Sequence, residues 1–241
     1  AIAESCDVYF YLLGQRLGIE GMAKWLSRFG FGERTGVDLS FEASGLIGTP
    51  EWSRQVRGTP WYPGEAVSVS IGQGPVLATT IQLARAFALL ANRGEAVTPH
   101  MVAAPAVEPV FERIDPAHLT LVNNALAEVV HGPSGTARRI GRLPMAGKTG
   151  TAQVIRLQEG LDADELAPEF RHHAWFVGWA PLDEPELVVA VIVEHGGDGG
   201  SMAAPVAARV VEAHLGQLPP PPDPQSPPPP VRTPDSPRGA G

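Results

Sequence analysis

Two apolar segments in the C-terminal half of the chain place the tightest constraint on its fold. AWFVGWA (residues 174–180) and LVVAVIVE (187–194) are rich in β-branched and aromatic residues, a composition typical of strands. Only PLDEPE separates them, and a connection this short fits a β-hairpin. A third strand is expected at KTGTAQVI (148–155). The chain is therefore expected to build an antiparallel sheet.

Segments with the apolar spacing of helices precede and follow these strands. The clearest is TTIQLARAFALLANRG, which Thr79 or Thr80 caps and Gly94 ends. Its expected buried stripe consists of Ile81, Ala84, Phe87, Ala88 and Ala91. Two more helices are expected near residues 116–131 and 203–215. The residues expected to face inward from the first of these are Leu119, Val122, Leu126 and Val129.

The N-terminal part of the chain combines helices with a long irregular segment. A helix is expected over residues 8–17, with Ser5 or Asp7 as its N-cap, and a second helical segment stops at Gly30. Residues 32–76 are rich in Gly and Pro and predict a long irregular connection. Three aromatic residues are expected to anchor it by packing: Trp52, Trp61 and Tyr62.

Composition limits the number of domains and the class of partner. Hydrophobic residues make up 44% of the 241 residues, enough for a substantial core, which we assign to one domain over residues 1–217. Residues 218–241 are too rich in Pro to form a core and are expected to be a disordered tail. The net charge of −8 argues against nucleic acid as a partner. The single cysteine, Cys6, excludes an intrachain disulfide.

The segment MAGKTGTAQV contains Lys148, one of only two lysines in the chain. A phosphate-binding P-loop would require a glycine at position 142, but Arg142 stands there and the glycine is Gly141. A P-loop lysine also opens a helix, whereas the residues after Lys148 favour a strand. A nucleotide-binding module is therefore disfavoured.

As a strand, the same segment presents groups that suit a small anion. Lys148 supplies a positive charge, and Thr149 and Thr151 supply hydroxyls. Gly147 and Gly150 are expected to remove side chains where the backbone of a ligand approaches. The edge of such a strand can pair with an extended peptide, and the N–H of Thr151 can stabilise an oxyanion. Taken alone, however, a Lys-Thr-Gly tripeptide is better explained as a surface strand with a solvated lysine.

The segment SCD at residues 5–7 also has two interpretations. Ser5 and Asp7 can serve as an N-cap and a favourable charge in the first turn of a helix. In the functional interpretation, Ser5 instead relays a proton, and Asp7 orients a lysine or a substrate amide. Taken alone, the segment favours the cap.

Together, the two segments resemble the penicillin-binding transpeptidases, which share three motifs with serine β-lactamases: Ser-x-x-Lys, Ser-x-Asn (or Asp) and Lys-Thr/Ser-Gly. SCD is similar to the second motif and KTGT to the third. The resemblance extends over residues 1–217, and WYPGE, IGQG and the Asp of SCD are most like the elongation-specific branch of the class B enzymes. It implies the serine β-lactamase/transpeptidase-like fold, of the α/β (α+β) class, with an antiparallel sheet flanked by helices and incomplete at the N-terminus.

The resemblance also implies a role for each candidate residue in acyl transfer from D-Ala-D-Ala stem peptides. Ser5 would shuttle a proton to the leaving amine, and Asp7 would bond near the lysine of the first motif or the substrate amide. Lys148 would set a positive potential and hold Ser5. Thr149 and Thr151 would hold the substrate carboxylate, and the N–H of Thr151 would complete the oxyanion hole.

The first motif is absent from the 241 residues. It requires a serine three residues before a lysine, and the residues three before Lys24 and Lys148 are Gly21 and Met145. The sequence also opens, without Met, on a candidate helix cap. We therefore expect a fragment of a longer chain, inactive by itself, with the nucleophile and a membrane anchor encoded upstream.

The resemblance requires no cofactor, but some similar enzymes bind Zn²⁺ through a cysteine at the position of Cys6. The other ligands would come from outside this chain, and the alternative for Cys6 is a small, partly buried residue at a helix start. His172, His173 and His195 are interpreted as polar residues at loop ends, not as ligands.

The expected partners and location follow from the family. They are peptidoglycan stem peptides and lipid-linked precursors, β-lactams, a membrane-embedded glycan polymerase and other proteins of the elongation complex. The expected place is the periplasmic face of the bacterial inner membrane. The alternative from another functional class is a penicillin-recognising sensor domain, which shares all three motifs.

Overall fold

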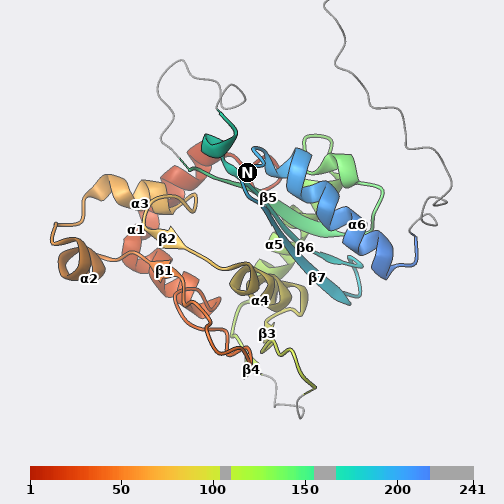
Figure 1. The fold of residues 1–241 in the computed structure, drawn as a ribbon, viewed down its shortest axis with the longest axis horizontal. Coiled ribbons are helices and arrows are strands. Elements are labelled where there is room, and N and C mark those ends of the chain that lie inside the picture. The colour runs from red at the N-terminus through yellow and green to blue at the C-terminus, as the bar shows by residue number, and fades with distance from the viewer. Residues whose placement is uncertain (104–109, 155–166, 218–241) are drawn as a thin grey trace, which may run out of the picture.

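The three expected strands form one antiparallel sheet of order β5-β6-β7, with β5 spanning Ala146–Ala152, β6 His173–Ala180 and β7 Leu187–Val193 (Figure 1). The predicted hairpin between the last two is confirmed. β5 begins earlier than expected because Ala146 and Gly147 still pair with Trp179 and Gly178. The computed structural model describes residues 1–103, 110–154 and 167–217, so the predicted Pro-rich tail lies outside the described residues.

Helices cover both faces of this sheet. α6 (Ala204–His214) packs on the face that carries Ala174 and Phe176 of β6, where it forms the main core with the end of α5 (Pro116–His131). Trp179 points to the opposite face and meets Phe87 of α4 (Thr80–Ala91). Figure 1 shows α6 and α4 on opposite sides of the sheet. The expected sheet flanked by helices is confirmed, with the alternation of a strand placing neighbouring residues in different cores.

The predicted caps and faces of the helices are partly correct. Thr79 caps α4 through a capping box with Gln82. The predicted buried stripe of α4 is partly correct. Ala91 is buried, and Phe87 is half-buried and packs against the core at Trp179. Ile81, Ala84 and Ala88 are only half-buried, and the prediction missed the buried residues Gln82, Ala86 and Leu89. The amide of Gln82 donates to the carbonyls of Glu33 and Ser44, which explains a buried polar residue in this helix. In α5, the inward direction of Leu119, Leu126 and Val129 is confirmed, and Val122 is half-buried.

The two helical segments expected at the N-terminus form one element, α1 (Asp7–Arg28), which Gly18 interrupts with a left-handed φ of 67°. The prediction that Ser5 or Asp7 caps it is wrong. Cys6 occupies the N-cap position without a side-chain bond to the helix, and Asp7 is already the first helical residue. The hydroxyl of Ser5 is therefore available for another partner.

The irregular connection predicted for residues 32–76 is only partly irregular. It contains two paired strands and three short helical elements, namely β1 (Leu46–Ile47), α2 (Pro50–Trp52), η1 (Ser53–Arg57), α3 (Pro63–Val69) and β2 (Val76–Leu77). Pro50 and Pro63 stand at the starts of α2 and α3, where a proline favours a helix. The prolines that suggested an irregular segment thus begin helices. α3 packs closely on α1 at Gly14. A Cβ added to Gly14 would overlap the side chain of Ser70, the residue that ends α3.

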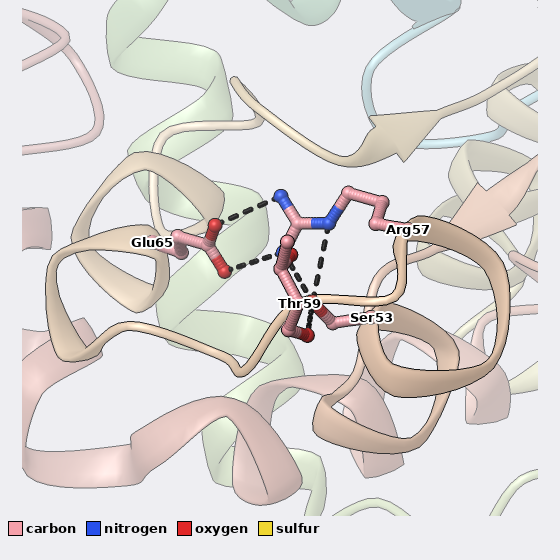
Figure 2. Close-up of polar contacts among 4 residues, drawn as sticks. All are labelled: Ser53, Arg57, Thr59 and Glu65. Atoms are coloured by element: carbon pink, nitrogen blue, oxygen red, sulfur yellow. Dashed lines mark hydrogen bonds and ion pairs between the residues drawn. The ribbon is translucent and has the colours of Figure 1, made fainter.

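Arg57 joins η1 to the start of α3 (Figure 2). Its guanidinium makes two parallel bonds of 2.9 Å to the carboxylate of Glu65 and also bonds the hydroxyl of Ser53. It lies 5.0 Å from the ring centre of Trp52 and 6.0 Å from that of Trp61. Trp52 and Trp61 therefore act as packing anchors, as predicted. Tyr62 does not, since it is 57% exposed.

The remaining elements complete the chain in the described residues. They are β3 (Glu95–Ala96), β4 (Val110–Phe111), η2 (Arg138–Ile140), η4 (Pro168–Phe170) and η5 (Gly199–Ala203). Within the same residues, no helix combines the length and apolar character that crossing a membrane requires.

Candidate active site

A cleft of about 560 Å³ lies along the outer edge of β5, between the start of α1, the turn after α3 and the start of η5. The residues that line it include the candidates from the two sequence motifs: Ser5, Asp7, Lys148, Thr149, Gly150 and Thr151. A second cavity, between α1 and the β1 region, has Glu33 as its only charged lining residue. The cleft at β5 is therefore the candidate site.

Lys148 and Ser5 meet in this cleft, although 143 positions separate them. The ammonium of Lys148 donates hydrogen bonds to the hydroxyl of Ser5 and, over 2.8 Å, to the carbonyl of Thr149. Figure 1 shows the N-terminus beside β5. Ser5 has a left-handed φ of 50°, which is uncommon for a residue with a Cβ. Such backbone strain gathers at functional sites, where the surroundings hold it in place.

Burial sets the charge state of Lys148. It lowers the pKa of the ammonium to about 8, and the nearby carboxylate of Asp7 opposes part of that shift. A lysine with this pKa is mostly a cation at pH 7, and it can also exchange a proton near that pH. Lys148 can therefore attract an anion and pass a proton to or from Ser5.

The outer edge of β5 pairs with no other strand in the described part of the chain, because β6 pairs with its inner edge. The carbonyl of Thr149 faces this outer edge, since Lys148 bonds it there, and the carbonyl of Thr151 accepts a bond of 2.9 Å from Gln73. In a strand, the N–H and C=O of one residue point to the same side. The N–H of Thr151 therefore also faces the cleft, as an oxyanion donor requires.

Thr136 is a site residue that sequence reasoning missed. Its hydroxyl bonds the hydroxyl of Thr149 over 2.7 Å, and its backbone N–H donates to the carbonyl of Ala3 over 3.2 Å. It therefore ties the segment before Ser5 to β5. The hydroxyl of Thr149, expected to contact a ligand, has a protein partner. The only sequence signal was the run of small residues after α5 that contains Thr136.

Gly147 and Gly150, the two glycines of β5, have different functions. A Cβ added to Gly147 would overlap the ring of Phe176 and come within 2.8 Å of the carbonyl oxygen of Val177. The expectation that Gly147 makes room for a ligand is therefore wrong, because its missing side chain makes room for the core. Gly150 does line the cleft, and a Cβ there would lie 3.3 Å from the Cβ of Trp175.

His172 and Asp198 also line the cleft, and the sequence analysis assigned no site role to either. His172 is buried, 6% exposed, and its Nδ1 accepts a bond from the N–H of Val154. The carboxylate of Asp198 accepts the N–H of Ser201 at the start of η5. Neither residue lies in a recognisable motif, so only the fold brings it to the cleft.

Cys6 does not form a metal site with the other described residues. Its thiol is exposed and it is not among the residues that line the cleft. Among the described residues, no three His, Cys, Asp or Glu side chains gather closely enough to hold a metal ion. A zinc role for Cys6 stays a prediction that depends on ligands outside these residues.

Over most of its length, the chain is similar to known penicillin-binding transpeptidases. Residues 1–212 match the family model described as penicillin binding protein transpeptidase domain. The chain is 43% identical to the peptidoglycan D,D-transpeptidase MrdA of Acinetobacter baumannii, over 84% of this chain and 32% of that protein. It is 34% identical to MrdA of Escherichia coli K12, over 83% of this chain and 34% of that protein. The chain thus spans about a third of the length of these curated relatives.

Solved structures agree with the sequence comparison. The structure of PBP2 from Pseudomonas aeruginosa in complex with WCK 5153 superposes with a TM-score of 0.78 and 42% identity, over 89% of this chain and 48% of that one. The complex between PBP2 and MreC from Helicobacter pylori superposes with a TM-score of 0.78 and 32% identity, over 90% of this chain and 40% of that one.

Proposed function

The chain belongs to the penicillin-binding protein transpeptidase family, and on that basis we propose that the full-length protein is a peptidoglycan D,D-transpeptidase of cell elongation. The observation that carries the proposal is the bond from Lys148 to Ser5 in the cleft at the edge of β5. The sensor alternative is not retained, because the relatives compared above are transpeptidases.

We propose that a serine outside the 241 residues attacks the carbonyl of the penultimate D-Ala of a stem peptide. The C–N bond to the terminal D-Ala breaks, and an acyl-serine forms. The proton of the attacking serine passes to the lysine of the first motif, which also lies outside the 241 residues. Ser5 gives its proton to the leaving amine and is itself reprotonated by Lys148. An amine from a neighbouring peptide then attacks the ester and forms the cross-link. Lys148 regains a proton from that amine through Ser5, and the first-motif lysine returns its proton to the freed serine.

The cleft would hold the substrate by its charges and by the edge of β5. Lys148 attracts the terminal carboxylate, and Thr151 offers it a hydroxyl. The N–H of Thr151 stabilises the oxygen that becomes negative in the transition state. Thr149 acts together with Thr136, because the two hydroxyls are bonded to each other. β-Lactams would enter the same cleft with their carboxylate at Lys148.

The proposed partners and location follow the relatives. One solved relative is a PBP2 bound to MreC, and another belongs to a structure described as a peptidoglycan synthase complex that coordinates polymerisation and crosslinking. By analogy, we propose that this protein works with a membrane-embedded glycan polymerase at the periplasmic face of the inner membrane. Lipid-linked precursors would supply its stem peptides.

Covalent labelling tests this function. The full-length protein should react with one equivalent of fluorescent penicillin, and unlabelled benzylpenicillin should block the reaction. It should also release D-Ala from a stem pentapeptide when a second peptide amine is present. A protein that neither labels nor releases D-Ala contradicts the proposal, and labelling without D-Ala release indicates a sensor.

The rate constant for acylation by benzylpenicillin should fall as the pH rises through about 8, because the free enzyme sets this constant and the pKa of Lys148 is about 8. Below that pH Lys148 is a cation and attracts the carboxylate, whereas above it the amine is neutral. In Lys148→Arg the charge persists to much higher pH, so the fall should disappear between pH 7 and 9.5. The same fall in both proteins would assign it to another group.

A further inference from the structure

Gln73 places a side-chain amide on the free edge of β5. Its Nε2 donates to the carbonyl of Thr151 over 2.9 Å, and its Oε1 accepts the N–H of Gln153 over 3.4 Å. These are the outward-facing backbone groups of two alternate residues, one at the end of β5 and one just after it. They are the groups that an extended peptide uses when it adds to the edge of a sheet. Gln73 therefore occupies part of the edge that an added peptide would pair with.

The turn after α3 directs Gln73 to this position. Gly72 and Gly74, on either side of it, have left-handed φ values of 74° and 73°. The backbone N–H of Gln73 donates to the carbonyl of Ser68 over 3.0 Å. This bond ties the turn to α3, whereas the side chain of Gln73 bonds β5 and the residue after it through its amide. The backbone of Gln73 is thus anchored independently of its side-chain bonds to Thr151 and Gln153.

The contact with Thr151 conflicts with ligand binding in the proposed function, on which this inference rests. Thr151 would donate its N–H to the oxyanion, so the acyl donor lies beside it. An amide N–H next to the reacting carbonyl of the donor would then face the carbonyl of Thr151. That carbonyl already accepts the amide of Gln73.

We propose that Gln73 is a specificity-determining residue that competes with the amide N–H of the acyl donor for the carbonyl of Thr151. A ligand that carries such an amide must displace the side chain of Gln73 before it pairs with β5. A ligand without the amide makes no use of this carbonyl and leaves Gln73 in place. Gln73 therefore selects between acyl donors by the strength of their pairing with β5.

Two β-lactams separate these cases in the full-length protein. Benzylpenicillin carries an acylamide N–H, whereas penicillanic acid has the same ring system without that side chain. Acylation by each is followed as the loss of sites for fluorescent penicillin. Gln73→Ala removes both bonds to β5. Gln73→Glu keeps the length and the acceptor for Gln153, and replaces the donor to Thr151 with a carboxylate oxygen. The negative charge that it adds acts on both β-lactams, because each carries a carboxylate, and it therefore affects the ratio of their rates less than either rate alone.

In both variants, the ratio of the benzylpenicillin rate to the penicillanic acid rate should rise about 2- to 10-fold, the effect of one hydrogen bond. Both rates are measured on one preparation, so the ratio does not depend on the fraction that is folded. A ratio that is unchanged or lower overturns the inference and leaves the proposed function standing. If wild-type protein reacts with neither β-lactam, the proposed function fails, and the inference fails with it.

Discussion

Replacement of Lys148 by alanine should reduce the rate of penicillin labelling of the full-length protein by about 100-fold or more. Loss of a single preorganised donor in an active site costs about that much, and Lys148 supplies both a donor and a charge. Ser5 would lose the bond from Lys148, and the carboxylate of the ligand would lose its cation. The measurement is the second-order rate constant of labelling, with circular dichroism to establish that the variant is folded.

The chain contains a matched control for this experiment. Lys24, the only other lysine, is exposed on α1 and does not line the cleft. Lys24→Ala removes the same charge and should label at the rate of the wild-type protein. Undiminished labelling of Lys148→Ala would remove Lys148 from the site, and an equal loss in both variants would point to net charge instead of position.

Gly147→Ala should destabilise the fold by about 3 kcal/mol, the upper part of the range for an extra methyl in a packed core. The added Cβ would overlap the ring of Phe176, which is fully buried, and would crowd the carbonyl of Val177. Both neighbours belong to β6, so neither can move without a shift in the sheet. The midpoint of thermal unfolding should fall by roughly 6–12 °C.

Two other glycines provide the comparison. A Cβ on Gly64 would have no neighbour within 4 Å, so Gly64→Ala should leave the midpoint nearly unchanged. Gly150→Ala, in the cleft, should slow penicillin labelling and cost less stability than Gly147→Ala, because its Cβ would crowd the Cβ of Trp175 at 3.3 Å without overlapping it. A midpoint for Gly147→Ala equal to that of Gly64→Ala would contradict the packing explanation.

Sequence patterns were sufficient where the determining interactions are local. The hairpin of β6 and β7 follows from strand-forming residues around a short connection, and the start of α4 follows from Thr79 and Gln82, three residues apart. The three inward residues of α5 follow from helical spacing. The same reasoning missed the burial of Gln82 in α4, because its amide bonds the carbonyls of Glu33 and Ser44, 49 and 38 positions away.

The functions of Ser5 and Gly147 show what local patterns could not decide. A serine before a helix can act as a cap or as a proton relay. A glycine in a strand can leave room for a ligand or for a packed side chain. Sequence alone therefore determined the motifs, the strands and most of the helices, since these depend on residues a few positions apart. Only the tertiary structure decided which hydroxyl meets Lys148, which glycine faces Phe176 and that Gln73 and Thr136 reach β5. Those contacts join segments far apart in the chain, and their geometry depends on how the whole chain packs.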